Sequence, residues 1–226
     1  MNKRIITATF LMAMSSLAGF AQRQFDNLDR GLIAVKSNGG MYCSWRINAD
    51  EYYATTYDLY RDGVKVNDQP LTVSNFTDPN GTLESQYTVK AVHAGQASAD
   101  SKKGLSLANE WLEVKKPKRI SNDGKTDISN QYEPNDATIG DVDGDGEMEL
   151  ITKQLFIGQD PNNTSQADFA RIEVQKLDGT LLWWIDCGPN MWDFQQNEIN
   201  IMAYDWDGDG KAECVARLQD GSVIHM

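Results

Sequence analysis

The sequence predicts an all-β protein in which a two-sheet β-sandwich is followed by the first blade or blades of a β-propeller. In the first half, short runs of alternating apolar and polar residues are separated by Gly-rich and Asp-Gly turns, and no stretch has a helical period. In the second half, one acidic loop template occurs twice, each time followed by an apolar run of strand length. A repeat of about 40–60 residues with four strands is typical of a propeller blade.

Residues 1–21 have the three parts of a signal peptide in the usual order. Lys3 and Arg4 precede an apolar stretch over residues 5–17, and Gly19-Phe20-Ala21 supplies small residues before a cleavage point. The apolar stretch is too short to cross a membrane, and no Cys stands near the cleavage point to carry a lipid anchor. We therefore expect an exported protein, periplasmic or extracellular, without a membrane anchor. A buried N-terminal helix is the alternative.

Export predicts an oxidising compartment, in which the three cysteines cannot all pair. Cys43 lies in an alternating run with Trp45, so we expect it to be a small buried hydrophobic residue. Cys187 and Cys214 could pair with each other or stay free, and the sequence favours neither.

Residues 22–120 are predicted to form the β-sandwich and the linker that follows it. Asp62-Gly63 between two alternating runs is a strong β-hairpin signal. A Trp on an early strand and a Tyr-rich hairpin supply the core of a small two-sheet domain, and this pattern resembles a fibronectin type III-like module. The expected strands lie at residues 32–36, 41–47, 56–61, 64–67 and 86–92.

A basic stretch, Lys115-Lys116-Pro117-Lys118-Arg119, ends this part of the chain. Five such residues could form a patch that binds a polyanion. A Pro within a short charged run is more typical of a solvated linker between domains, which is our interpretation.

Residues 141–149 and 205–213 share the template D-x-D-G-D-G-x-x-E, and the two copies start 64 residues apart. Carboxylates at positions 1, 3 and 5 of a tight loop converge on one point, Gly at position 6 permits the turn, and position 7 offers its carbonyl oxygen. Such hard oxygen ligands suit Ca²⁺. We predict two calcium sites with these ligands: Asp141, Asp143, Asp145, Glu147 and Glu149 in the first, and Asp205, Asp207, Asp209, Lys211 and Glu213 in the second.

The loops differ from helix–loop–helix calcium sites, in which the closing Glu stands at position 12, because Thr152 and Ala216 occupy that position. A pair of Asp-Gly turns with solvated acids is the other interpretation. Four carboxylates at the same offsets in two places would, however, repel one another unless a cation relieved the repulsion. The apolar runs near each loop predict strands at residues 149–155, 170–177 and 180–186, and again at 214–218 and 222–224.

Residues 121–226 are therefore predicted to form an incomplete calcium-binding β-propeller. Only one blade and part of a second can be recognised, whereas propellers close with about four to eight blades. Met226 falls within a strand pattern. From this we expect the chain to be the N-terminal part of a longer protein.

Charge is distributed unevenly along the 226 residues. The chain has 33 acidic and 21 basic residues, and 21 of the acidic residues but only 6 of the basic ones lie in residues 121–226. An acidic excess argues against a protein that grips nucleic acid through a basic face. We expect no nucleic-acid partner, and we expect cation sites in the second half.

Several ordered motifs resemble one known family. Residues 132–147 read Y-E-P-N-D-A-T-I-G-D-V-D-G-D-G-E, residues 176–183 read K-L-D-G-T-L-L-W, and residues 204–213 contain D-G-D-G-K-A-E. Upstream, L-D-R-G-L-I-A-V at residues 28–35 and Y-R-D-G at residues 60–63 look like the start of the same family's β-sheet domain. Together they resemble the bacterial rhamnogalacturonan lyases of the calcium-containing β-propeller type, over nearly the whole chain after residue 21.

The resemblance implies cleavage of the rhamnogalacturonan I backbone of pectin by β-elimination, in a cleft on an eight-bladed propeller with structural Ca²⁺. It implies a pectic polysaccharide as the partner, and we expect a monomer. Asn135 and Asp136 match the family's Asn-Asp pair before the first loop, and Lys153 matches a Lys in the next strand. The resemblance assigns these three residues to substrate binding or to its support. It identifies no catalytic base, and we expect residues 1–226 alone to be inactive.

The chain departs from the family pattern in two connections, at residues 154–163 and 189–197. Because binding residues often lie in loops, these changes bear on substrate and activity more than on fold. The alternative function is a non-catalytic, calcium-stabilised protein that binds glycans or a protein partner.

Overall fold

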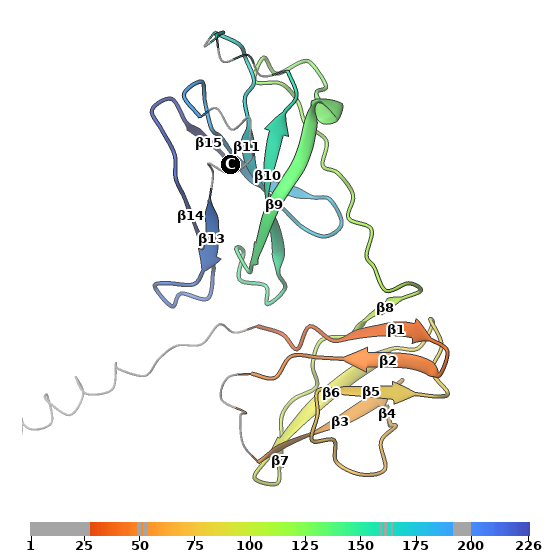
Figure 1. The fold of residues 1–226 in the computed structure, drawn as a ribbon. Helices are drawn as coiled ribbons and strands as arrows, with labels where there is room; N and C mark the ends of the chain where they lie inside the picture. Colours follow the sequence, from red (N-terminus) through yellow and green to blue (C-terminus); the bar gives the residue numbers. More distant parts are fainter. Residues whose placement is uncertain are drawn as a thin grey trace, which may run out of the picture.

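The computed structural model describes residues 28–48, 51, 54–158, 160, 162–163, 165–191 and 200–226. The expected signal peptide at residues 1–21 lies outside these residues. The described chain is all-β, as predicted, with a single short 3-10 turn, η1 (Ser129–Gln131). Figure 1 shows two units, one formed by strands β1 to β8 and the other by β9 to β15.

Strands β1 to β8 form two four-stranded sheets that share one core. The sheet orders are β5-β2-β1-β8 and β4-β3-β6-β7. Cys43 and Trp45 are buried between the sheets with Tyr57 and Tyr87, as expected from the alternating runs. The strands are β1 (Ile33–Ser37), β2 (Gly40–Ser44), β3 (Thr55–Arg61), β4 (Val64–Lys65), β5 (Asn75–Asp78), β6 (Tyr87–His93), β7 (Gln96–Ala97) and β8 (Leu105–Leu107).

The Asp62-Gly63 hairpin is confirmed. Both residues have positive φ angles, 51° for Asp62 and 80° for Gly63, and the flanking residues Arg61 and Val64 pair across the turn. This is the backbone that a two-residue hairpin needs to match the twist of its strands.

The second unit contains a five-stranded sheet of order β15-β12-β11-β10-β9 and a separate hairpin, β13-β14. The first four strands along the chain form an antiparallel meander. The last strand, β15, pairs with β12 and not with its predecessor β14. The strands are β9 (Tyr132–Gly140), β10 (Glu149–Phe156), β11 (Arg171–Gln175), β12 (Leu181–Asp186), β13 (Ile201–Tyr204), β14 (Glu213–Ala216) and β15 (Val223–His225).

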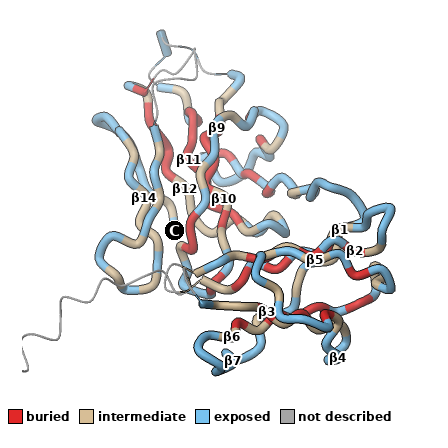
Figure 2. The backbone as a smooth tube through the Cα atoms, turned by 60° about the horizontal axis from the view of Figure 1, so that its bottom comes forward, coloured by how far each residue is buried: buried red, intermediate tan, exposed pale blue. Residues whose placement is uncertain are grey.

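The central strand β11 is buried on both faces, as the continuous buried colour of this region in Figure 2 illustrates. Its apolar side chains, Ile172 and Val174, pack with Ile151 and with partly buried residues of the β13-β14 hairpin. Its polar side chains, Arg171, Glu173 and Gln175, alternate with them and are also buried. A polar face can be buried at low cost only where its groups find partners.

Arg119 supplies the main partner for this polar face. Its guanidinium donates two hydrogen bonds of 2.7 Å to the two carboxylate oxygens of Glu173, and both side chains are at most 1% exposed. The interpretation of residues 115–119 as a solvated linker is therefore wrong for Arg119, and Pro117 is buried as well. The cause is an ion pair between residues 54 positions apart, which a local charge pattern does not reveal.

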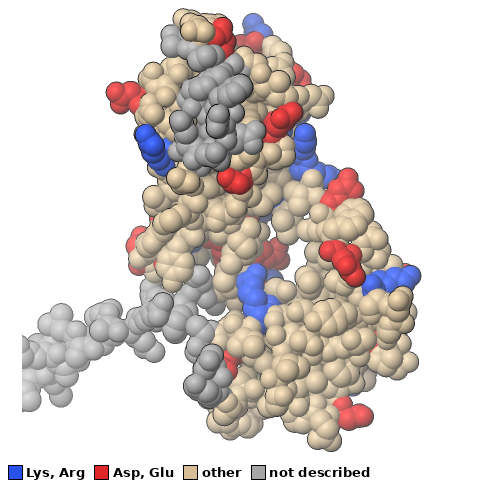
Figure 3. All heavy atoms as spheres, viewed as in Figure 1, with Lys and Arg blue, Asp and Glu red and all other residues tan. Residues whose placement is uncertain are grey.

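The two units meet at the first acidic loop. The Asp29 N–H donates to the Gly146 carbonyl at 3.0 Å, and the Lys102 ammonium donates to the Asp145 carbonyl and lies 3.6 Å from the Glu147 carboxylate. Figure 3 shows basic and acidic side chains close together where the two units face each other. Polar contacts from both main chain and side chains thus join the units.

None of the three cysteines, all of them among the described residues, forms a disulfide. Burial raises the pKa of Cys43 to about 12, which makes this thiol unreactive at neutral pH. Within the described residues, no helix is long and apolar enough to cross a membrane.

The Arg119–Glu173 pair gives a direct test of the buried polar face. We expect Arg119→Met to lower the free energy of unfolding by about 3–5 kcal/mol, because it leaves the Glu173 carboxylate buried without its counter-charge. Urea unfolding followed by tryptophan fluorescence measures the change. Lys118→Met, at the exposed neighbouring position, is the matched control and should change stability by less than about 0.5 kcal/mol. A loss below about 1 kcal/mol in Arg119→Met would contradict the burial of the pair.

Candidate functional site

The first acidic loop, residues 141–149, connects β9 to β10 and is held by its own main chain. The Asp141 carboxylate accepts N–H groups from Gly144 and Gly146, both at 2.8 Å. The Glu149 carboxylate accepts the Val142 N–H at 2.9 Å. These bonds turn the carboxylates at positions 1 and 9 toward the inside of the loop.

The second acidic loop, residues 205–213, connects β13 to β14 with the same pattern of hydrogen bonds. Asp205 accepts N–H groups from Gly208 at 2.6 Å and from Gly210 at 2.9 Å, and Glu213 accepts the Trp206 N–H at 2.9 Å. The glycines at positions 4 and 6 have φ angles between 77° and 91° in both loops, where other residues are strained. The shared template therefore encodes one shared backbone.

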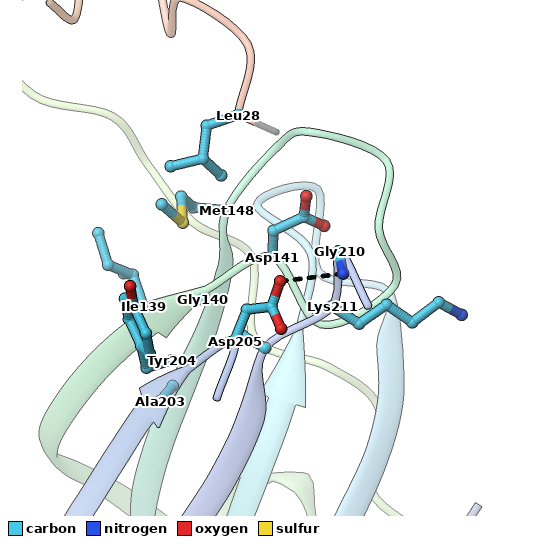
Figure 4. Close-up of a pocket in the computed structure, with 11 residues that line it drawn as sticks. Leu28, Ile139, Gly140, Asp141, Met148, Ala203, Tyr204, Asp205, Gly210 and Lys211 are labelled. Atoms are coloured by element: carbon cyan, nitrogen blue, oxygen red, sulfur yellow. Dashed lines mark hydrogen bonds between the residues drawn. The ribbon is translucent and has the colours of Figure 1, made fainter. Parts of the chain in front are cut away.

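The two loops lie side by side. The Ala212 N–H donates to the Asp141 carbonyl at 2.6 Å, and a pocket of about 130 Å³ lies between the strands that carry the loops. Figure 4 shows Asp141 and Asp205 next to each other, with Leu28 and Met148 on the opposite side of the pocket.

Each loop brings carboxylate oxygens to one point. One ligand atom from each of Asp205, Asp207, Asp209 and Glu213 lies within 4.8 Å of the others, and the same holds for Asp141, Asp143 and Glu149. A set made only of carboxylate oxygens matches the ligands that hard divalent cations take in proteins. The residues present therefore fit a calcium ion. Asp145 falls outside the compact set of the first loop.

Asp145 has another partner, the ammonium of Lys176. This ammonium lies 2.6 Å from Asp143 and 2.8 Å from Asp145. The hydrogen bond from Lys176 holds the pKa of Asp145 below its usual value. Burial raises the pKa of Glu149, and the nearby Asp143 charge adds to this effect. The first loop thus has a cationic side chain among its acids.

The three residues assigned to substrate binding meet at a β-bulge between β9 and β10. Gln154 pairs with Pro134 and Thr152 with Ala137, so Asn135 and Asp136 face Lys153 where the register shifts. The Lys153 ammonium lies 3.8 Å from the Asp136 carboxylate.

The exposures of these side chains differ strongly. Asp136 is 78% exposed and Lys153 only 1% exposed. Lys153 is therefore buried rather than solvated. Bulges are frequent beside functional sites, because they redirect a side chain; at this one Asp136 is directed to solvent while Lys153 stays beneath it.

Sequence reasoning missed Lys176 as a partner of the first loop and Arg119, Glu173 and Arg171 as a buried network. Arg171 lies 2.9 Å from Asp168, and its guanidinium and that of Arg119 both lie over the Tyr132 ring. The sequence did hold a signal that the basic residues of this segment would be paired, because residues 121–226 have only six basic residues. In such an acidic segment each basic side chain has several candidate partners nearby.

Two family models match the chain one after the other. The model described as the rhamnogalacturonan I lyase β-sheet domain matches residues 23–106, and the model of the rhamnogalacturonan lyase family 11 C-terminal domain matches residues 110–225. Fold and sequence thus define a chain of the rhamnogalacturonan lyase class. More specifically, it belongs to rhamnogalacturonan lyase family 11. The family resemblance seen in the sequence motifs is confirmed at this level.

Two relatives from Bacillus subtilis strain 168 are similar over most of the chain. The rhamnogalacturonan endolyase YesW is 38% identical over 98% of the chain, and the rhamnogalacturonan exolyase YesX is 40% identical over 89% of it. The crystal structure of YesW superposes with a TM-score of 0.70, and that of a Bacillus licheniformis rhamnogalacturonan lyase, at 33% identity, with 0.68. The chain spans 37% of the length of YesW and 33% of that of YesX, about a third of each relative.

The hydrogen bonds inside the second loop lead to a prediction that needs no cation. Asp205→Ala removes the acceptor of the Gly208 and Gly210 N–H groups, so we expect the free energy of unfolding to fall by about 1–3 kcal/mol. The measurement is urea unfolding in excess chelator. Asp220→Ala, at an exposed position after β14, is the control. Equal stability of the two variants would show that the loop does not depend on this carboxylate.

Proposed function

We propose that the full-length protein carrying this chain is an exported lyase that cleaves the rhamnogalacturonan I backbone of pectin by β-elimination. The observation that supports this is the match of two lyase family models, in sequence, to residues 23–106 and 110–225. Both curated relatives are named as rhamnogalacturonan lyases. The signal-peptide pattern at residues 1–21 supports export, to a place where a plant polysaccharide would be met.

In β-elimination, a base takes the proton from C5 of a galacturonate residue and the C4 oxygen leaves, which creates a C4–C5 double bond. The substrate carboxylate must be neutralised for the C5 proton to become acidic, and a positively placed group serves that need. The Asn135–Asp136 segment at the bulge is our candidate for contact with the sugar hydroxyls. Buried Lys153 would hold Asp136 in place from beneath.

We further propose that each acidic loop holds one structural Ca²⁺, and that the strands β9 to β12 form one blade of a β-propeller. The antiparallel meander of these strands is the arrangement that a blade requires. The first site would use Asp141, Asp143, Asp145 and Glu149 with the Glu147 carbonyl. The equivalent ligands of the second would be Asp205, Asp207, Asp209 and Glu213 with the Lys211 carbonyl.

Chelation tests the calcium proposal. Ca²⁺ at about 100 times its dissociation constant stabilises the folded state by about 2.7 kcal/mol per site, so excess chelator should lower the melting temperature of the second unit. In excess chelator, amide hydrogen exchange measured on separate peptides should become faster around residues 141–149 and 205–213. It should change little in β1 to β8. Added Ca²⁺ should restore the original rates. An unchanged melting curve and unchanged exchange in chelator would refute bound structural calcium.

Activity is tested by ultraviolet absorbance of the new double bond. The full-length protein should raise the absorbance with debranched rhamnogalacturonan I and not with homogalacturonan, whereas residues 22–226 alone should not raise it. Asp136→Asn in the full-length protein should lower kcat/KM about tenfold, equivalent to about 1.4 kcal/mol. Glu133→Gln, at an exposed position on the same strand, is the matched control. Glycan binding without any rise in absorbance would favour the non-catalytic binding protein instead.

A further inference from the structure

The Lys176 side chain occupies the carboxylate cluster of the first acidic loop. It follows directly after β11, and its ammonium lies 2.6 Å from Asp143, 2.8 Å from Asp145 and 3.7 Å from Glu149. Asp143 and Glu149 belong to the group of carboxylates whose oxygens converge on one point. A positive charge of the chain itself therefore already stands among the predicted ligands.

The second loop has the same template, but its carboxylates have no such partner among the described residues. In the described part of the chain, no Lys or Arg forms an ion pair with Asp205, Asp207, Asp209 or Glu213. Lys211 is the nearest candidate by sequence, but Figure 4 shows its side chain extending away from Asp205. The two loops thus share a backbone and differ in how their negative charge is balanced.

We propose that Lys176 is a built-in counter-cation that competes with Ca²⁺ for the first loop, so that the first loop is the weaker calcium site and the second the stronger one. This inference rests on the proposed calcium binding. Calcium takes its oxygen ligands at about 2.3–2.6 Å. An ammonium within 3 Å of two of those ligands must leave before the ion can use them.

The same arrangement gives Lys176 a role when no calcium is present. Asp143, Asp145 and Glu149 would otherwise repel one another within a tight turn. The ammonium relieves this repulsion, so the first loop can hold its shape while the second depends more on a bound ion. The pairs are about one-third exposed, and such pairs are each worth about 0.2–1 kcal/mol. Displacing them should weaken calcium binding roughly tenfold.

Calorimetric titration of the chain with Ca²⁺ tests the competition. The double substitution Asp207→Asn with Asp209→Asn removes calcium binding by the second loop, so that the heat of binding still measured comes from the first loop. On this background, we expect Lys176→Met to tighten calcium binding about tenfold and Lys176→Arg to leave it weak. Lys102→Met is the matched control, because Lys102 contacts the same loop only at the Asp145 carbonyl and the Glu147 carboxylate. It should change the affinity less than about threefold.

Thermal unfolding gives a second readout with the opposite sign. In excess chelator, Lys176→Met should lower the melting temperature of the otherwise native chain, because the carboxylates lose their counter-charge; in saturating Ca²⁺ the loss should disappear. Calcium affinity of the first loop unchanged by Lys176→Met would overturn the proposed competition and leave the calcium sites standing. If neither the native chain, with both loops intact, nor any variant binds calcium, the calcium proposal itself is overturned, and this inference with it.

Discussion

The second unit depends on a fully buried ion pair. Strand β11 lies in the middle of its sheet. Apolar side chains packed on its polar face would leave the polar groups buried without hydrogen-bond partners. Arg119 satisfies Glu173 with two hydrogen bonds and brings the preceding chain across that face. The opposite face is then available for apolar packing with the β13-β14 hairpin. Both acidic loops follow strands that this core holds, so their side-by-side position follows from the packing around β11.

The negative charge of the acidic loops can be balanced in three ways. Main-chain N–H groups bind the carboxylates at positions 1 and 9 in both loops. Among the described residues, a lysine side chain balances part of the remaining charge in the first loop and none does so in the second. The proposed Ca²⁺ would be the third means, and the second loop would have the greater need of it. Identical sequence templates can therefore differ in ion affinity because of residues that lie outside the template.

Local sequence patterns were sufficient for two-thirds of the described strands, the Asp62-Gly63 hairpin and the acidic loop backbones, since each depends on residues close together in the chain. They did not predict β5, β7, β8, β9 or β13. The assignment of Asn135, Asp136 and Lys153 to substrate binding came from family resemblance, whereas the bulge at which they meet was not predicted. Arg119 and Lys176 could not be assigned from pattern, because their partners are distant in the sequence. The sequence did not indicate that β15 pairs with β12, because strand order is a non-local property.

The polar contacts of Asp29 and Lys102 with the first acidic loop make the junction between the two units part of that loop's energetics. Thermodynamic linkage is reciprocal. If occupancy of the loop strengthens its contacts with the first unit, a load that pulls the units apart must weaken the loop's hold on its ion by the same free energy.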